Sequence, residues 1–534
     1  MALSLLICGI VVILSIASYK ISNKFGIPTL VIFILLGIIF GSDGVFKIPF
    51  ENYELTEQVC SVALILIMFY GGFSTNWKVA KPVASKAIWL STLGVIVTAV
   101  LTGMFCYLIL GFEFLESILI GSVISSTDAA SVFSILRAKR LNLKYGVASL
   151  LEIESGSNDP MSYMLTISVL SLMNGEFSKK FFYMLFSQVF FGILCGVIIA
   201  VIAIWILKNS KILISGLDTI LVVAIAIIAY ALPTLIGGNG YLSAYLVGII
   251  MGNSSIKNKI TLVHFFDGVT GLAQILLFFL LGLLSFPSEI PKIIIPALAT
   301  TLFLTFIARP IAVFSILGPM KSSLEEKLLV SCAGLRGAAS IVFAIMVTID
   351  EAYLQNDIFH IVFCVALFSV TFQGTLLPYL ARKLSMVDNE ESVLKTFNDY
   401  QEDSNIQFIE THVNYNHNWI GKSISELELG FDTLIVMIKR GKEIIIPKGN
   451  TVVNIGDIVV LSGRAYKNDV EATLEEIKVE KGHKWEGKRI KELSISEKAL
   501  VILIIRLDGS TVIPRGSTFI KYGDTIVVSQ KIKK

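Results

Sequence analysis

Long apolar segments separated by short polar loops make up roughly the first 385 residues of the chain. Each segment runs for about 15 to 25 residues, the length that a helix needs to cross a hydrocarbon core of about 30 Å. We therefore predict an α-helical membrane protein with about thirteen transmembrane helices, at residues 2–19, 27–41, 58–73, 87–110, 115–136, 147–173, 181–207, 214–232, 238–252, 267–286, 292–317, 326–349 and 357–381.

Lysines and arginines are unevenly divided between the loops on the two sides of these spans. Loops that follow odd-numbered spans hold seventeen of them, and loops that follow even-numbered spans hold four. Because basic loops stay in the cytoplasm, the amino terminus is predicted to lie outside the cell inner (plasma) membrane and the carboxyl terminus inside. The first span has no basic segment before it, which favours an uncleaved first helix over a signal peptide.

Thirteen spans divide into six, one and six, and the second six begin on the opposite side of the membrane. This arrangement predicts two inverted six-helix repeats, as in many secondary transporters. The spans at 115–136 and 326–349 correspond under this division, and each contains a weak point, at 121–126 and 334–337. We predict that both helices are broken there and cross near the middle of the membrane.

The last 135 residues or so differ in composition and contain an internal repeat. Trp419 and Trp485 each open a Trp-x-Gly-Lys-x-Ile-x-Glu-Leu sequence, at an offset of 66 residues. Each copy has the pattern of a strand, a short helix and further strands, which predicts small cytoplasmic α+β domains. No GxGxxG follows a strand, so a regulatory binding module is favoured over a Rossmann domain. The predicted organisation is a transmembrane domain at 1–385, a charged linker at 386–405 and repeats at 406–471 and 472–534.

The composition excludes several classes of protein. Of the residues, 54% are hydrophobic and only 16% are charged, too few charges to cover the surface of a soluble enzyme of this length. The net charge of +3 is too small to imply a nucleic acid partner. The six cysteines lie in or beside apolar segments without a CxxC pair, so we expect neither a disulfide framework nor a metal site, and no cofactor.

Ionisable residues at bilayer depth are costly, so each one is a candidate for function. The span at 147–173 holds Glu154, Ser155, Asn158 and Asp159 in little more than one helical turn. A carboxylate beside an amide and hydroxyls offers oxygen ligands to a monovalent cation, or a site for a proton. Competition of the two for Asp159 is the chemistry of exchange, and it is electroneutral because one positive charge travels each way.

Further candidates lie on other spans. Asp128 follows Thr127 in a polar patch and is predicted to neutralise amide dipoles at the ends of half-helices. Arg336 is predicted to form a structural ion pair with Glu154. Glu152 and Arg309 are secondary candidates, for which a scaffold or interface role is favoured. The predicted cation- and proton-binding set is Asp159, Asn158, Ser155, Thr127 and Asp128.

These motifs resemble the monovalent cation:proton antiporter family of the NhaP and sodium/proton exchanger type. The resemblance covers roughly residues 1–385 and rests on Thr127-Asp128, Glu154-Ser155 with Asn158-Asp159, and Gly334-Leu335-Arg336-Gly337. It implies that Asp159 binds the cation or proton, that the other four residues of the predicted set surround it, and that Arg336 bridges to Glu154. It also implies a homodimer in which a six-helix core domain moves against a dimerisation domain.

The sequence Glu-Ser-Gly-Ser-Asn-Asp-Pro at 154–160 looks most like that of bacterial potassium/proton antiporters of the NhaP group, also called the CvrA type. This likeness favours potassium as the exchanged cation, with sodium as the alternative. The two cytoplasmic repeats resemble TrkA-C (RCK-C) domains, which follow the membrane domain in that group. Such domains dimerise and can bind a small regulator, for which cyclic di-AMP is a candidate.

Two other classes of protein remain as alternatives. A cation channel gated by RCK-type domains needs a carbonyl-lined filter such as TVGYG, which the sequence lacks. An intramembrane aspartyl protease using Asp128 and Asp159 needs a Gly-x-Gly-Asp signature, also absent, and Arg336 is an odd neighbour for carboxyls that share a proton. The leading prediction is a regulated electroneutral antiporter, not an enzyme.

Overall fold

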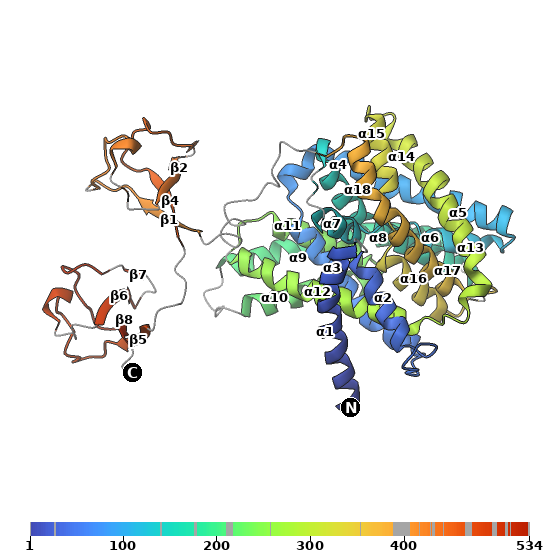
Figure 1. Ribbon diagram of the computed structural model, residues 1–534, viewed down its shortest axis with the longest axis horizontal. Coiled ribbons are helices and arrows are strands. Elements are labelled where there is room, and N and C mark those ends of the chain that lie inside the picture. The colour runs from blue at the N-terminus through green and yellow to red at the C-terminus, as the bar shows by residue number, and fades with distance from the viewer. Residues whose placement is uncertain are drawn as a thin grey trace. The chain divides into compact units, whose positions relative to one another are not determined.

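The chain divides into two compact units, Met1–Val393 and Leu394–Lys534. The computed structural model shows a bundle of helices in the first unit and two small β-sheets in the second (Figure 1). Most of the predicted linker at 386–405 lies outside the described residues. These are 2–25, 28–138, 141, 143–175, 179–209, 217–256, 258–352, 354–387, 406–415, 417–427, 429, 433–441, 443–464, 472–493, 499–507, 511–512 and 514–531.

The helices of the first unit follow the predicted apolar segments. Those before residue 210 are α1 (Ala2–Phe25), α2 (Thr29–Phe40), α3 (Tyr53–Ser74), α4 (Trp77–Trp89), α5 (Val95–Phe105), α6 (Phe114–Val123), α7 (Ala129–Ala138), α8 (Val147–Met173) and α9 (Lys179–Asn209). Those after it are α10 (Leu217–Leu235), α11 (Gly240–Gly252), α12 (Lys259–Leu284), α13 (Ile290–Phe303), α14 (Arg309–Leu317), α15 (Leu324–Cys332), α16 (Ala338–Ile349), α17 (Ile358–Phe368) and α18 (Gly374–Lys383). Single π-helical turns join α4 to α5, α13 to α14 and α17 to α18 into longer helices.

Within the described residues, seven helical stretches are long and apolar enough to cross a membrane. They are Tyr53–Ser74, Trp77–Leu110, Phe181–Asn209, Leu217–Leu235, Thr261–Leu284, Ile290–Leu317 and Ile358–Lys383. Five shorter apolar helices accompany them, at Gly9–Ser18, Thr29–Phe40, Phe114–Val123, Gly240–Gly252 and Ala338–Ile349. The chain is therefore a multi-pass helical membrane protein, while the count of thirteen crossings and the inverted repeat stay predictions.

Glycines bring the backbones of neighbouring helices together in the first unit. A Cβ atom on Gly72 of α3 would lie 2.3 Å from the carbonyl oxygen of Tyr245 on α11. One on Gly248 of α11 would lie 2.1 Å from the carbonyl oxygen of Phe69 on α3. Association of helices in a membrane relies on such close van der Waals packing, because lipid tails are as apolar as the helix surfaces. This packing fixes α3, which lines the site described below.

The second unit contains two antiparallel four-stranded sheets that share one topology (Figure 1). The strand orders are β1-β4-β2-β3 and β5-β8-β6-β7, and a register shift falls at the same place in β2 and in β6. This confirms the internal repeat, although the short predicted helices are single 3-10 turns, at Ile424–Glu426 and Ile490–Glu492. The strands are β1 (Ile406–His412), β2 (Leu434–Arg440), β3 (Glu443–Ile445), β4 (Ile458–Arg464), β5 (Ala472–Lys478), β6 (Ala499–Ile505), β7 (Thr511–Val512) and β8 (Thr525–Lys531).

An arginine-aspartate pair occupies the same place in both sheets. Arg440, at the end of β2, donates from Nε and Nη2 to the two carboxylate oxygens of Asp457 at 2.8 and 2.9 Å. Arg506 donates from Nη1 to Oδ2 of Asp524 at 2.5 Å, and both aspartates are 1% exposed. The hydrogen bonds from Arg440 lower the pKa of Asp457. In each repeat the pair therefore ties the second strand to the turn before the fourth.

We predict that Asp457→Asn destabilises the first repeat by about 2 kcal/mol, because an amide cannot accept charge-assisted hydrogen bonds from both guanidinium nitrogens. Since folding lowers the pKa of Asp457, this stabilisation is present above about pH 4 and is lost as pH falls through the lowered pKa. Limited proteolysis of the full chain over a temperature series measures the loss. Glu410→Gln, which alters an exposed carboxylate on β1, is the control, and equal sensitivity of the two variants would contradict the prediction.

Candidate functional site

The site is built on two helices that are interrupted inside the helical unit. α6 ends at Val123 and α7 begins at Ala129, while α15 ends at Cys332 and α16 begins at Ala338. Both interruptions overlap the predicted weak points. The two irregular segments meet each other, because the backbone N–H of Asp128 donates to the carbonyl oxygen of Leu335 at 2.8 Å.

Arg336 fills the junction between the two segments. Its Nη1 donates to the carbonyl oxygens of Ser125 and Ser126 at 2.6 and 2.8 Å, and its backbone N–H donates to Ser369 Oγ at 3.0 Å. These two carbonyls lie in the irregular segment just past Val123, the last residue of α6, near the negative end of that helix's dipole. A cation that is 1% exposed therefore satisfies groups that water cannot reach.

Asp128 occupies the opposite end of the junction. Its carboxylate accepts from the backbone N–H of Ser131 at 3.2 Å and from Ser131 Oγ at 2.5 Å, which caps the amino terminus of α7. A Cβ on Gly337, the residue before α16, would lie 2.2 Å from Asp128 Oδ2, so only glycine leaves room for this carboxylate. Asp128 thus lies at the start of two half-helices, where their dipoles favour a negative charge.

The predicted ion pair between Glu154 and Arg336 is wrong. Glu154 Oε1 lies instead 2.6 Å from Arg309 Nη2, and both side chains are almost fully buried. The guanidinium of Arg336 instead donates hydrogen bonds to the carbonyl oxygens of the first interruption. A Cβ on Gly334 would lie 2.7 Å from Arg309 Nε. Glycine at 334 therefore lets Arg309 pack against the second interruption and reach Glu154 on α8.

The remaining predicted site residues meet where α8 passes the first interruption. Ser155 Oγ donates to the carbonyl oxygen of Thr127 at 2.6 Å, and Asn158 Nδ2 donates to Thr127 Oγ1 at 2.5 Å. Asp159 accepts a hydrogen bond from Ser126 Oγ. The five residues of the predicted binding set are therefore brought together, and Ser126 joins them.

A small cavity of about 40 Å³ lies beside the Asp159 carboxylate, close to the volume that one water molecule takes in the liquid. It has room for one small ion or water, with carboxylate and hydroxyl oxygens in its wall. The structure does not place Glu152 there: its Oε1 accepts from Thr75 Oγ1 at 3.0 Å, at the end of α3. The lining residues are Leu64, Ile67, Ser126, Thr127, Asp128, Asp159, Gln274, Phe278, Gly337, Ala338 and Ala339.

Two lining residues were missed by the sequence reasoning. Ser126 lies in the predicted polar patch beside Thr127, and no role of its own was predicted for it. Gln274 stands alone in the apolar span at 267–286, and that isolated amide was a usable signal. Chemically, the cavity wall offers the carboxylates of Asp159 and Asp128, hydroxyl oxygens and an amide to a monovalent ligand.

Comparisons with known proteins are consistent with this geometry. The sequence profile of the family "Sodium/hydrogen exchanger, transmembrane" matches residues 10–383. The K(+)/H(+) antiporter NhaP of Alkalimonas amylolytica is 35% identical over 392 residues, which cover 73% of this chain and 68% of that protein. The K(+)/H(+) antiporter NhaP2 of Shewanella sp. (strain ANA-3) is 33% identical over 466 residues, which cover 86% of this chain and 81% of that protein.

A solved structure and a second family profile match the two units of the chain. The sodium proton antiporter MjNhaP1 from Methanocaldococcus jannaschii, solved at pH 8, matches with a TM-score of 0.64 and 25% identity, over 72% of this chain and 99% of that one. The profile of the TrkA-C domain matches residues 409–465 and 474–533, which contain most of the first and second sheet. The chain therefore belongs to the sodium/hydrogen exchanger family, a family of cation/proton antiporters rather than enzymes, and carries two TrkA-C domains.

Proposed function

We propose that this protein exchanges a monovalent cation for a proton, electroneutrally, with the two ligands competing for the carboxylate of Asp159. The observation that carries the proposal is the position of Asp159, which lines a cavity of about 40 Å³ where two interrupted helices meet. A buried carboxylate needs either a proton or a cation, because an isolated charge is costly in an apolar environment.

The other charges of the site support a single exchanging group. Glu154 is neutralised by Arg309, Asp128 caps α7, and Arg336 is bound to backbone carbonyls. Among the described residues, no basic side chain pairs with Asp159 in the same way. One carboxylate that alternates between one proton and one monovalent cation moves no net charge over a cycle.

An amide next to the carboxylate adds a ligand for the cation. Asn158 is fully buried, and its Oδ1 accepts no hydrogen bond in the described part of the chain. A buried carbonyl oxygen without a donor costs about 1 to 3 kcal/mol, and a cation held between Asn158 and Asp159 would remove that cost. Hydroxyl oxygens of Ser126 and Thr127 lie in the same wall.

The proposed cation is potassium, with sodium as the alternative. Two relatives at 35% and 33% identity are named K(+)/H(+) antiporters, and a more distant relative at 27% identity is named Na(+)/H(+) antiporter 1. A gated cation channel is not favoured, because the sequence contains no carbonyl-lined filter segment such as TVGYG.

The proposed transport cycle is alternating access in a homodimer. Thirteen crossings with two inverted six-helix repeats would put α6–α7 and α15–α16 at corresponding positions, consistent with their matching interruptions. With basic loops inside, the amino terminus lies outside the cell and the TrkA-C domains lie in the cytoplasm. There they regulate exchange by binding a small ligand, for which cyclic di-AMP is one candidate.

Asp159→Asn is predicted to abolish cation-induced proton movement while the protein still inserts into the membrane, because the amide keeps the shape of the side chain and loses the group that binds either ligand. Everted membrane vesicles with a pH-sensitive dye measure the exchange. Asp43→Asn, the same change at an exposed loop position, is the control and should exchange normally. Exchange by Asp159→Asn at the wild-type rate would contradict the assignment of Asp159 as the group that binds the cation and the proton.

Removal of residues 400–534 is predicted to leave exchange in place and to change its response to pH, salt or a regulatory ligand. The reason is that the carboxylate, cavity and interrupted helices all belong to the first unit. Vesicles containing the shortened protein, titrated with potassium at several pH values, measure the response with and without cyclic di-AMP. Complete loss of exchange at normal membrane levels would show that the TrkA-C domains are part of the transport machinery.

A further inference from the structure

One face of α12 runs from the exposed Asp267 to the cavity. Asp267, Gly271, Gln274 and Phe278 follow one another at spacings of four, three and four, so they lie within about 60° of each other around the helix. Gln274 and Phe278 line the cavity beside Asp159, whereas Asp267 is exposed. At 1.5 Å per residue, about 10 Å of helix separate Asp267 from Gln274.

A matching face of α3 runs beside it. Leu64 and Ile67 line the same cavity, and Gly71 continues their face toward the end of α3 at Ser74. α3 and α12 are joined near this point, where Tyr70 OH donates to Asp267 Oδ1 at 2.5 Å. The two faces therefore lead from the cavity toward the same end of the unit, and Tyr70 holds the Asp267 carboxylate between them.

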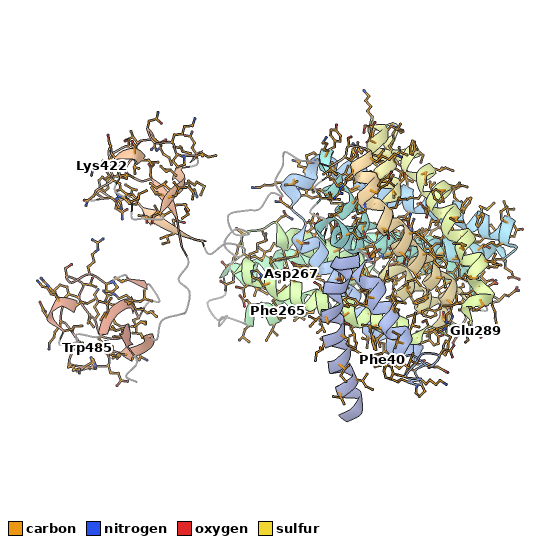
Figure 2. All side chains as sticks on the ribbon, in the orientation of Figure 1. Phe40, Phe265, Asp267, Glu289, Lys422 and Trp485 are labelled. Atoms are coloured by element: carbon orange, nitrogen blue, oxygen red, sulfur yellow. The ribbon has the colours of Figure 1, made fainter. Side chains whose placement is uncertain are left out.

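Three glycines near these two faces have open space beside their backbone. A Cβ added to Gly71, to Gly268 or to Gly271 would meet no atom within 4 Å, unlike the glycines that pack helix against helix. Asp267 and Glu289 lie on opposite sides of the helical unit (Figure 2). The open glycines and the exposed carboxylate thus belong to one end, the end at which we place the cytoplasm.

We propose that Asp267 and Gln274 form the access route for the cation on that side and help to select it. The proposal rests on the exchange at Asp159 proposed above. The Asp267 carboxylate raises the local concentration of cations at the mouth of the route. The Gln274 side-chain oxygen replaces part of the hydration shell as the cation reaches Asp159, and it does so without adding a charge that binds protons.

The first test measures exchange in everted vesicles against cation concentration for Gln274→Leu. The expected result is a rise of about tenfold in the half-saturating potassium concentration, from the loss of one oxygen ligand, with a maximal rate within about twofold of wild type. Gln188→Leu removes a buried amide from α9, away from the cavity, and should change neither value. An unchanged half-saturating concentration in Gln274→Leu would overturn the role of Gln274.

A second variant covers the case in which Gln274→Leu fails to insert. Gln274→Asn keeps the amide but shortens the side chain by one carbon, which moves the amide oxygen away from the cavity. The variant is expected to change the ratio of half-saturating concentrations for sodium and potassium. A ratio equal to that of wild type would overturn the selective role. If wild-type vesicles showed no cation-dependent proton flux, the proposed exchange function itself would be wrong. This failure is distinguishable from a failure of the role proposed for Gln274.

Asp267→Asn tests the mouth of the route by its dependence on salt. At low ionic strength the half-saturating potassium concentration is expected to rise about threefold, and the difference should disappear when an impermeant salt shortens the Debye length to about 3 Å near 1 M. Glu289→Gln, on the opposite side, is the matched control and should show no such difference. A salt-independent effect, or none at all, would overturn the role of Asp267.

Discussion

Backbone groups that leave a helix inside a membrane must find partners within the protein, and this constraint organises the site. Two interruptions face each other, so Leu335 accepts from Asp128 and Arg336 donates to the carbonyls that follow the end of α6. Residues of both interruptions line the cavity beside Asp159 on α8. A structural necessity of the bilayer thus creates the polar environment in which an ion can bind.

The charges of the site are divided between support and exchange. Arg336 donates to a carbonyl just after the end of α6, and Asp128 caps the start of α7. Arg309, which packs against Gly334, neutralises Glu154. Each of these groups has a fixed partner, and loss of the partner of Arg336, Arg309 or Glu154 would leave a buried charge unpaired, which is costly. Among the described residues, no basic side chain pairs with the Asp159 carboxylate in this way. We assign transport to Asp159 for that reason.

Much of the architecture followed from the sequence, because a bilayer imposes helix length and hydrophobicity directly. The interruptions near Gly121–Ser126 and Gly334–Gly337 were predictable from small and polar residues inside apolar spans. The repeat opened by Trp419 and Trp485 was predictable from the repeated letters themselves. The arginine that pairs with Glu154 was not predictable, because the pairing depends on how far α14 lies from α8. Sequence spacing also gave no link between Gln274 and Asp159, which lie on separate helices.

The central claim is that one carboxylate carries one proton or one monovalent cation in each half of the cycle. The most direct test is the balance point of exchange by the purified protein in proteoliposomes at a series of imposed membrane potentials. The account predicts that a tenfold cation gradient is balanced by a pH difference of about one unit at every potential, because no net charge moves. A balance point that shifts with the membrane potential would show that more than one charge travels in one direction and would contradict the account.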